Sequence, residues 1–256
     1  MQGSDSAPTR WMIPVALVGI GAAGWGWSLQ MARDMAAAAT SMPGMAMTEM
    51  VSAGGFLFGW VAMMAAMMFP AIVPVVRLYA LAAARGGVAP LPLFVSGYLA
   101  VWTLPGIPAY FLWRWLDGPL TQAEPWAARL AGAVLLGAAA WQLSPWKAAC
   151  LRHCRSPMSF FLRHGGRIDR ALDAFRLGFL HGLFCFGCCW AMMAVLVALG
   201  TMNVAWMAVL SLLILLEKNG PAGYMLASAS AGLLAGAGAL LLWDPGWMDS
   251  ISLHFR

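Results

Sequence analysis

The chain has 256 residues, of which 62% are hydrophobic and only 10% are charged, and its net charge is +5. Its mean hydropathy is +0.75. Soluble domains carry about 25% charged residues, so most of this chain cannot face water and a soluble enzyme is excluded. Uncharged stretches of this length suit membrane-spanning helices better than the short alternating strands of a β-barrel. We therefore predict an all-α, polytopic membrane protein.

Charged residues divide the chain into intervals that are long enough for helices crossing a bilayer, which need about 20 mostly apolar residues. The intervals predict about seven spans within one integral membrane domain that covers residues 1–256. The predicted spans are residues 11–32, 51–76, 90–113, 126–146, 177–199, 201–216 and 220–243. Because the sixth is short, six spans with one re-entrant segment are the alternative.

The basic residues predict how the chain is oriented in the membrane. The loop at 147–176 contains seven of the 15 basic residues and only two acidic ones, and loops rich in Lys and Arg stay in the cytoplasm. Counting spans outward from this loop places the N-terminus in the cytoplasm as well. We predict a multi-pass protein of the bacterial inner membrane. The lipid bilayer accounts for the positive charge, so no nucleic-acid partner is expected.

The five cysteines fall into two groups. Cys150 and Cys154 follow the fourth predicted span, and Cys185, Cys188 and Cys189 lie inside the fifth. The loop between the two groups starts and ends on the same membrane face, so the groups can converge in space. Structural disulfides are not expected on the reducing, cytoplasmic side.

Helical periodicity places several of these residues on one face of the fifth span. At about 100° per residue, His181, Cys185 and Cys188 project to one side, and so does Met192 one turn further along. Thiolates and thioethers are soft ligands that select Cu(I), and thiolates also hold Zn(II). The predicted ligands are Cys150, Cys154, Cys185 and Cys188, with Cys189 and His181 as alternates and Met192 as a deeper relay. The alternative is that these are ordinary buried hydrophobic residues.

Methionines give a second, weaker indication of a soft metal. Residues 42–50 contain four methionines, and the second span contains Met63, Met64, Met67 and Met68. Methionine is also a common filler of membrane helices, so both interpretations stay open. Glu217 and Lys218 are expected either to neutralise each other at the inner interface or to support a site. Haem is not expected, because only His181 lies within a span.

Several motifs resemble those of a bacterial family labelled "predicted metal-binding integral membrane protein". The similarity covers roughly residues 52 to 220. It rests mainly on three runs, WVAMMAAMMFP at 60–70, CLRHCRSP at 150–157 and HGLFCFGCCW at 181–190. Shorter matches are Gly97-Tyr98, the run at 142–147, Met202-Asn203 and Glu217-Lys218. The resemblance implies metal binding by an integral membrane protein.

The leading hypothesis is a protein that binds and handles a soft metal, Cu(I), as a carrier or delivery protein. Copper is the expected metal and zinc is possible. The first alternative is a structural protein stapled by zinc, or an accessory subunit of a larger membrane complex. The second alternative is enzymatic, a membrane thiol–disulfide oxidoreductase. Besides lipid, the expected partners are membrane-protein subunits or a metal chaperone.

Overall fold

The computed structural model describes residues 7–41, 51–84, 90–121, 124–164, 170–199 and 203–247. Within these ranges the chain forms helices and no strand, which confirms the all-α prediction. The helices are α1 (Ala7–Ser41), α3 (Ala53–Ala84), α4 (Leu91–Thr103), α5 (Gly106–Thr121), α6 (Pro125–Gln142), α7 (Pro145–Arg155), α8 (Pro157–His164), α9 (Ala171–Leu199), α10 (Val204–Asn219) and α11 (Gly223–Trp243).

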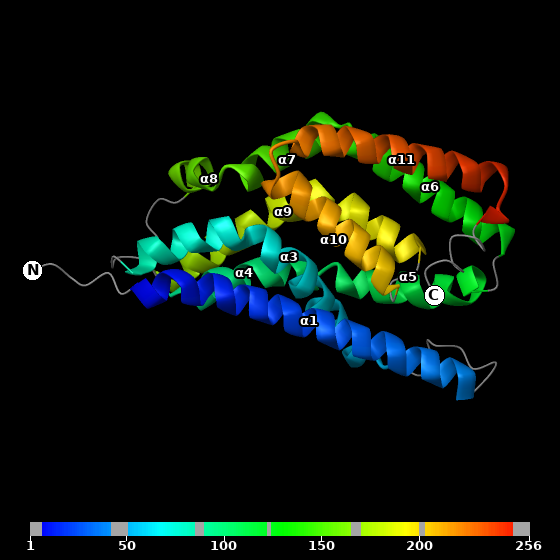
Figure 1. Ribbon diagram of the computed structural model, residues 1–256, viewed down its shortest axis with the longest axis horizontal. Helices are drawn as coiled ribbons and strands as arrows, with labels where there is room; N and C mark the ends of the chain where they lie inside the picture. Colours follow the sequence, from blue (N-terminus) through cyan, green and yellow to red (C-terminus); the bar gives the residue numbers. More distant parts are fainter. Residues whose placement is uncertain are drawn as a thin grey trace, which may run out of the picture.

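The long helices run along the long axis of an elongated bundle (Figure 1). The helices α6 and α11 lie side by side along one flank, and α1 lies along the opposite flank. Between them, α9 packs against α4, α6 and α7. The short helices α7 and α8 lie near the end of the bundle where α1 begins (Figure 1). The predicted cytoplasmic segments of the described chain therefore share one end.

Five helical stretches are long and apolar enough to cross a membrane. They are Val15–Asp34, Ala53–Ala83, Leu91–Leu116, Ala171–Leu199 and Gly223–Trp243. The third joins α4 and α5 across a short turn at residues 104–105. The other two predicted spans coincide with α6 and α10, which have 18 and 16 residues. Neither meets the same criteria within the described residues, so the predicted number of seven spans is not confirmed.

The basic segment at 147–176 is more structured than the loop predicted from its charges. It contains most of α7, all of α8 and the start of α9, which begins at Ala171 rather than at 177. Ser144 caps α7 by accepting a hydrogen bond from the Lys147 backbone N–H at 3.1 Å, and Pro145 suits the first helical position. Leu151 and Phe160 are buried. The segment is therefore amphipathic. Its many arginines made it resemble an exposed loop in the sequence.

The helices α4 and α9 approach so closely that only glycine fits at their contact. A Cβ on Gly97 would collide with the backbone carbonyl of Phe175, and one on Gly178 would collide with that of Phe94. Gly97 precedes Tyr98, whose side chain is fully buried. The close contact thus brings Tyr98 within reach of the cysteines of α9.

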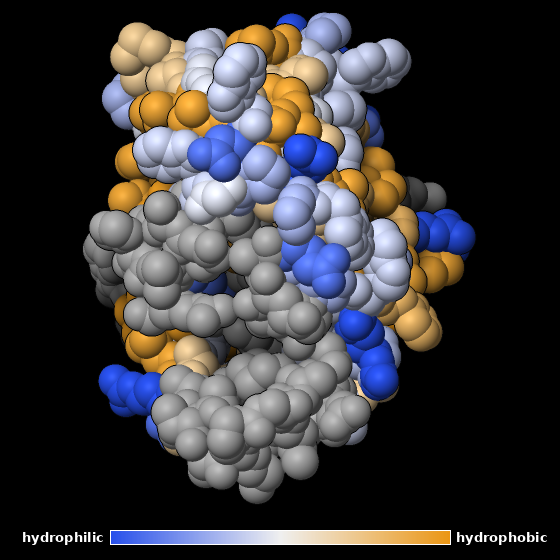
Figure 2. Space-filling view, turned by 90° about the vertical axis from the view of Figure 1, so that its right-hand side faces the viewer, coloured by the Kyte–Doolittle hydropathy of each residue, from blue (hydrophilic) through white to orange (hydrophobic). Residues whose placement is uncertain are grey.

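The surface of the bundle is that of a membrane protein. Phe111 is 65% exposed and Leu233 is 77% exposed, and both lie on helices of the described chain. Large exposed apolar surfaces indicate contact with lipid or with other proteins. Viewed from the end opposite α8, hydrophobic and hydrophilic side chains both lie at the surface (Figure 2). Exposed apolar side chains on long apolar helices are consistent with a membrane protein.

Candidate metal centre

The structure brings four of the five cysteines together, beside a methionine. Cys154 comes from α7, Cys185, Cys188 and Cys189 from α9, and Met68 from α3; we call these five residues the sulfur cluster. The Sγ atoms of Cys154 and Cys188 lie 3.8 Å apart. The thiols of Cys188 and Cys189 donate to the backbone carbonyl of Cys185 at 3.1 and 2.9 Å. All the cysteines are free.

Helical spacing and one glycine explain why the cysteines meet. Cys185, Cys188 and Cys189 are three and four residues apart, so their side chains share one side of α9. The neighbouring position, Gly187, leaves room for α7, because a Cβ there would lie 2.7 Å from the Sγ of Cys150. Cys150 therefore lies against α9 beside the cluster, and both it and Cys154 are half-buried.

A lysine ammonium lies within the sulfur cluster. The Nζ of Lys218 is 2.8 Å from the Sγ of Cys185 and 3.8 Å from both the Sγ of Cys189 and the Sδ of Met68. The hydroxyl of Tyr98 lies 3.0 Å from the same Cys185 sulfur. Both side chains are buried, since Lys218 is 4% exposed and Tyr98 is 0% exposed. The ammonium therefore places a positive charge among the sulfur atoms.

A second buried polar group, the carboxylate network, consists of Gln142, Lys147, Glu217 and Ser230. Lys147 Nζ forms an ion pair with Glu217 Oε2 at 2.6 Å and donates to the Gln142 side-chain oxygen. Gln142 Nε2 in turn donates to Glu217 Oε1 at 2.7 Å and to Ser230 Oγ at 2.6 Å. Glu217 thus pairs with Lys147 of α7. This corrects the expectation that it neutralises Lys218, because consecutive residues point to different sides of α10.

The predicted ligand His181 lies among aromatic rings, one turn from Cys185. It is 1% exposed, and its ring centroid is 5.0 Å from that of Phe160 and 6.0 Å from that of Tyr98. Within the described residues its Nδ1 has no hydrogen-bond partner. A buried polar atom without a partner is costly, so this nitrogen is open to a ligand. Met192 is fully buried in α9, one turn beyond Cys188.

The two cysteines of α7 have perturbed acidities. Burial raises the pKa of the Cys150 thiol, and the adjacent Cys188 adds to the rise. Hydrogen bonding to Cys185 and Cys188, together with burial, raises the pKa of the Cys154 thiol well above its usual value. Both thiols are therefore protonated near neutral pH, and a metal that binds them must displace a proton.

The separation of Cys154 and Cys188 fits two thiolates that share one ion. With a metal–sulfur bond of about 2.3 Å, two such sulfurs lie about 3.8 Å apart at a tetrahedral angle and about 4.6 Å apart on a linear ion. The observed 3.8 Å falls at the tetrahedral end of this range. In the described part of the chain, no group of three or more His, Cys, Asp and Glu side chains is arranged to hold an ion. The distance between these two sulfurs is therefore compatible with a shared ion.

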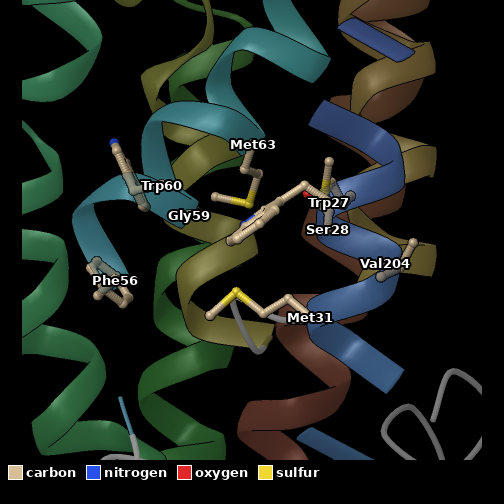
Figure 3. Close-up of a pocket in the computed structure, with 9 residues that line it drawn as sticks. Trp27, Ser28, Met31, Phe56, Gly59, Trp60, Met63 and Val204 are labelled. Atoms are coloured by element: carbon tan, nitrogen blue, oxygen red, sulfur yellow. The ribbon is translucent and has the colours of Figure 1, made fainter. Parts of the chain in front are cut away.

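Four methionines of α3 are buried in the bundle. Met63, Met64, Met67 and Met68 are each 6% exposed or less. Met63 also lines a cavity of about 30 Å³ together with Met31 of α1 and Met207 of α10. Trp27 projects into the same space (Figure 3). The methionine-rich stretch at 42–50 lies outside the described residues.

Tyr98 and Lys147 contact or support the site but were not predicted to do so, whereas Met68 and Lys218 were raised only as alternatives. All four lie in motifs that carry the family resemblance. Those motifs are the only sequence feature that singles these residues out. Hydropathy alone assigns Lys147 to a loop, and it cannot tell whether Tyr98 faces lipid or the protein core. Their contacts with the sulfur cluster join residues 29 to 150 positions apart in the chain.

The described chain is a helical bundle with five apolar stretches long enough to cross a membrane, and it gathers four cysteines and a methionine in one cluster. The chain matches the profile of the PpoB2 family, described as copper chaperone, over residues 57–241. This range extends from within α3 to within α11 and includes the whole sulfur cluster. The chain therefore belongs to the PpoB2 copper chaperone family and handles copper. No curated protein and no solved structure matches it.

Proposed function

We propose that the protein is a membrane-embedded copper chaperone that binds Cu(I) between Cys154 and Cys188 and passes it on. The observation that carries this proposal is the 3.8 Å separation of the two sulfurs, which come from different helices. A ligand pair built across α7 and α9 can open when the helices move apart. A carrier needs that property because it must release its ion.

Ligand chemistry favours Cu(I) over Zn(II) as the ion. Soft thiolates select Cu(I), and two of them suffice for a two-coordinate ion. Structural Zn(II) sites use four ligands, and only two sulfurs are proposed to bind here.

The ion is expected to enter from the cytoplasm and to leave along α9. The half-buried Cys150 lies beside the pair and is suited to capture an ion from a cytoplasmic carrier. Met192 is one turn beyond Cys188 and provides a thioether for the outgoing ion. In this proposal the protein resides in the bacterial inner membrane, with its N-terminus and α7 on the cytoplasmic side.

The test is Cu(I) binding by the purified full-length protein in detergent, under reducing conditions and in competition with a chromogenic Cu(I) chelator. The variant Cys154→Ser/Cys188→Ser should bind Cu(I) at least about 100-fold more weakly, or about 2.7 kcal/mol. The comparison variant is Cys150→Ser, which removes the proposed capture thiol of α7 and leaves the Cys154–Cys188 pair intact. Its equilibrium affinity for Cu(I) should stay within about tenfold of wild type, because capture affects the rate of loading and not the final ligands.

Two outcomes would overturn the proposal. Wild-type protein that binds no Cu(I) would exclude a copper site of any kind. Equal Cu(I) affinity in wild type and in Cys154→Ser/Cys188→Ser would place the ion elsewhere. If zinc co-purifies with the protein and does not exchange with Cu(I), the alternative of a structural zinc site would be favoured.

A further inference from the structure

Lys218 occupies the position that a soft cation would take. Its ammonium lies 2.8 Å from Cys185 Sγ and 3.8 Å from Cys189 Sγ and Met68 Sδ. These three sulfurs come from α3 and α9, whereas the lysine reaches them from α10. Thiols and a thioether are weak hydrogen-bond acceptors, so they are unusual surroundings for a buried ammonium.

The carboxylate beside Lys218 in sequence is already engaged. Glu217 forms its ion pair with Lys147 at 2.6 Å and accepts a hydrogen bond from Gln142. A buried ammonium still needs an opposite charge close by. The nearest group that can supply one is Cys185, whose sulfur also lies 3.0 Å from the Tyr98 hydroxyl. Lys218 and the Cys185 thiolate therefore form the pair, and Tyr98 donates to the same sulfur.

We propose that Cys185, Cys189 and Met68 form a second Cu(I) position and that Lys218 is a tethered cation that occupies it between copper-binding events. This inference rests on the proposed function, because it supplies the next position for an ion held by Cys154 and Cys188. When Cu(I) arrives, copper–sulfur bonds form and the ion pair between Lys218 and Cys185 breaks. Copper stays Cu(I) throughout, so no electron is transferred.

The exchange leaves the net charge of the buried site unchanged. Cys189 would give up its thiol proton to water when it binds copper, so Cu(I) replaces one proton while the ammonium of Lys218 remains nearby. A divalent ion would add a charge that nothing in the cluster balances. The displaced ammonium remains near the last turn of α10, where helix carbonyls favour a cation. When the Lys218 ammonium returns to the sulfur atoms, it displaces Cu(I). Release of copper therefore needs no other cation to take its place.

The central experiment removes the tethered charge. Lys218→Met keeps much of the length and volume of the side chain, and Lys218→Arg keeps its charge. In detergent-purified protein, Lys218→Met should bind Cu(I) at least about tenfold more tightly than wild type and release it more slowly to a chelator. It should also discriminate less between Cu(I) and Zn(II). Lys218→Arg should retain wild-type selectivity. Equal affinity and release rate in Lys218→Met and wild type would overturn the proposal, as would weaker binding.

Two methionine variants test the second position independently, in case the Lys218 variants do not fold. Met68→Leu removes the sulfur that lies near Lys218, at little cost in packing. Met67→Leu is the matched control, because Met67 is equally buried on the same helix and differs by about 100° in direction. Met68→Leu should lose bound Cu(I) about tenfold faster than Met67→Leu. Equal rates would overturn the second position.

The two proposals fail in different ways. If Cys154→Ser/Cys188→Ser binds Cu(I) as wild type does, the proposed function fails. If that variant loses copper as expected while the Lys218 and Met68 variants behave as wild type, the proposed function stands. Only the proposed exchange between Lys218 and Cu(I) is then rejected.

Discussion

The carboxylate network and the sulfur cluster use consecutive residues of α10 in opposite ways. Glu217 points into a network in which lysine, glutamine and serine partners satisfy its carboxylate at 2.6 to 3.4 Å. Lys218 points into the cluster and meets sulfur atoms. A polar group with complementary partners holds helices together, whereas a cation surrounded by soft ligands can be exchanged. In the proposed function, the carboxylate network is the structural part of the molecule and the sulfur cluster is the part that handles the metal.

The network also determines where α7 lies. Lys147 is in the first turn of α7, Gln142 ends α6, and Ser230 belongs to α11. On the same helix, Arg155 donates to the Glu217 backbone carbonyl at 2.5 Å. These contacts connect α7 to α10 and keep Cys154 within reach of α9. The sulfur cluster therefore depends on the network, although the two do not share a ligand.

The largest expected effect comes from breaking the network. Glu217→Gln leaves the Lys147 ammonium buried without an opposite charge, which should lower the free energy of unfolding by about 3–5 kcal/mol. The double variant Lys147→Met/Glu217→Gln removes both charges and should recover most of that loss. Thermal unfolding in detergent, followed by tryptophan fluorescence, measures both. A Glu217→Gln variant as stable as wild type would contradict the structural role of the network.

The next largest effect concerns the contact that positions Tyr98. Gly178→Ala places a methyl group against the Phe94 carbonyl, so α4 must move away from α9. Such overpacking costs about 1–3 kcal/mol, and it should weaken Cu(I) binding by moving Tyr98 from Cys185. Gly232→Ala on α11 is the matched control, because its Cβ would meet nothing within 4 Å. Similar unfolding temperatures for both variants would show that α4 and α9 tolerate separation.

A smaller effect is expected from Met192→Leu. The substitution preserves volume and should cost less than about 1.5 kcal/mol, so the variant should fold and keep the copper held by cysteines. Only the proposed thioether relay is removed. Cu(I) movement across reconstituted vesicles should therefore slow while equilibrium binding stays unchanged. If the rate of Cu(I) movement is unchanged, Met192 is not a ligand for the outgoing ion.

The substitution with the smallest effect on stability tests the orientation. Met158 of α8 is 56% exposed, so Met158→Cys should leave the fold intact. A membrane-impermeant thiol reagent should label this cysteine only after the cells are permeabilised, because α8 carries the predicted cytoplasmic charges. Labelling in intact cells would invert the orientation and place the sulfur cluster near the outer face.

The sequence predicted the helices and the cysteine groups well because both have local signals. Hydropathy marks long apolar helices, and helical periodicity places Cys185 and Cys188 on one side of α9. The return of the chain to the same membrane face predicted that Cys154 would approach them, and the structure places it there. The number of spans was less certain, because α6 and α10 are short for a bilayer.

The partners of the buried charges could not be predicted from sequence patterns. Lys147 lies in a segment whose other basic residues suggest a solvent-exposed loop, yet it is 1% exposed and pairs with Glu217, 70 residues further on. The position of Lys218 among sulfurs likewise depends on how α3, α9 and α10 pack. Such contacts follow from the tertiary fold, which hydropathy and periodicity do not encode.

The most direct test of the central claim is X-ray absorption spectroscopy at the copper edge on the protein loaded with Cu(I). Wild type should show a coordination shell made of sulfur, and Cys154→Ser/Cys188→Ser should retain much less sulfur-bound copper at equal protein concentration. A shell of nitrogen or oxygen ligands in wild type would contradict the copper site. So would a double variant that retains as much sulfur-bound copper as wild type.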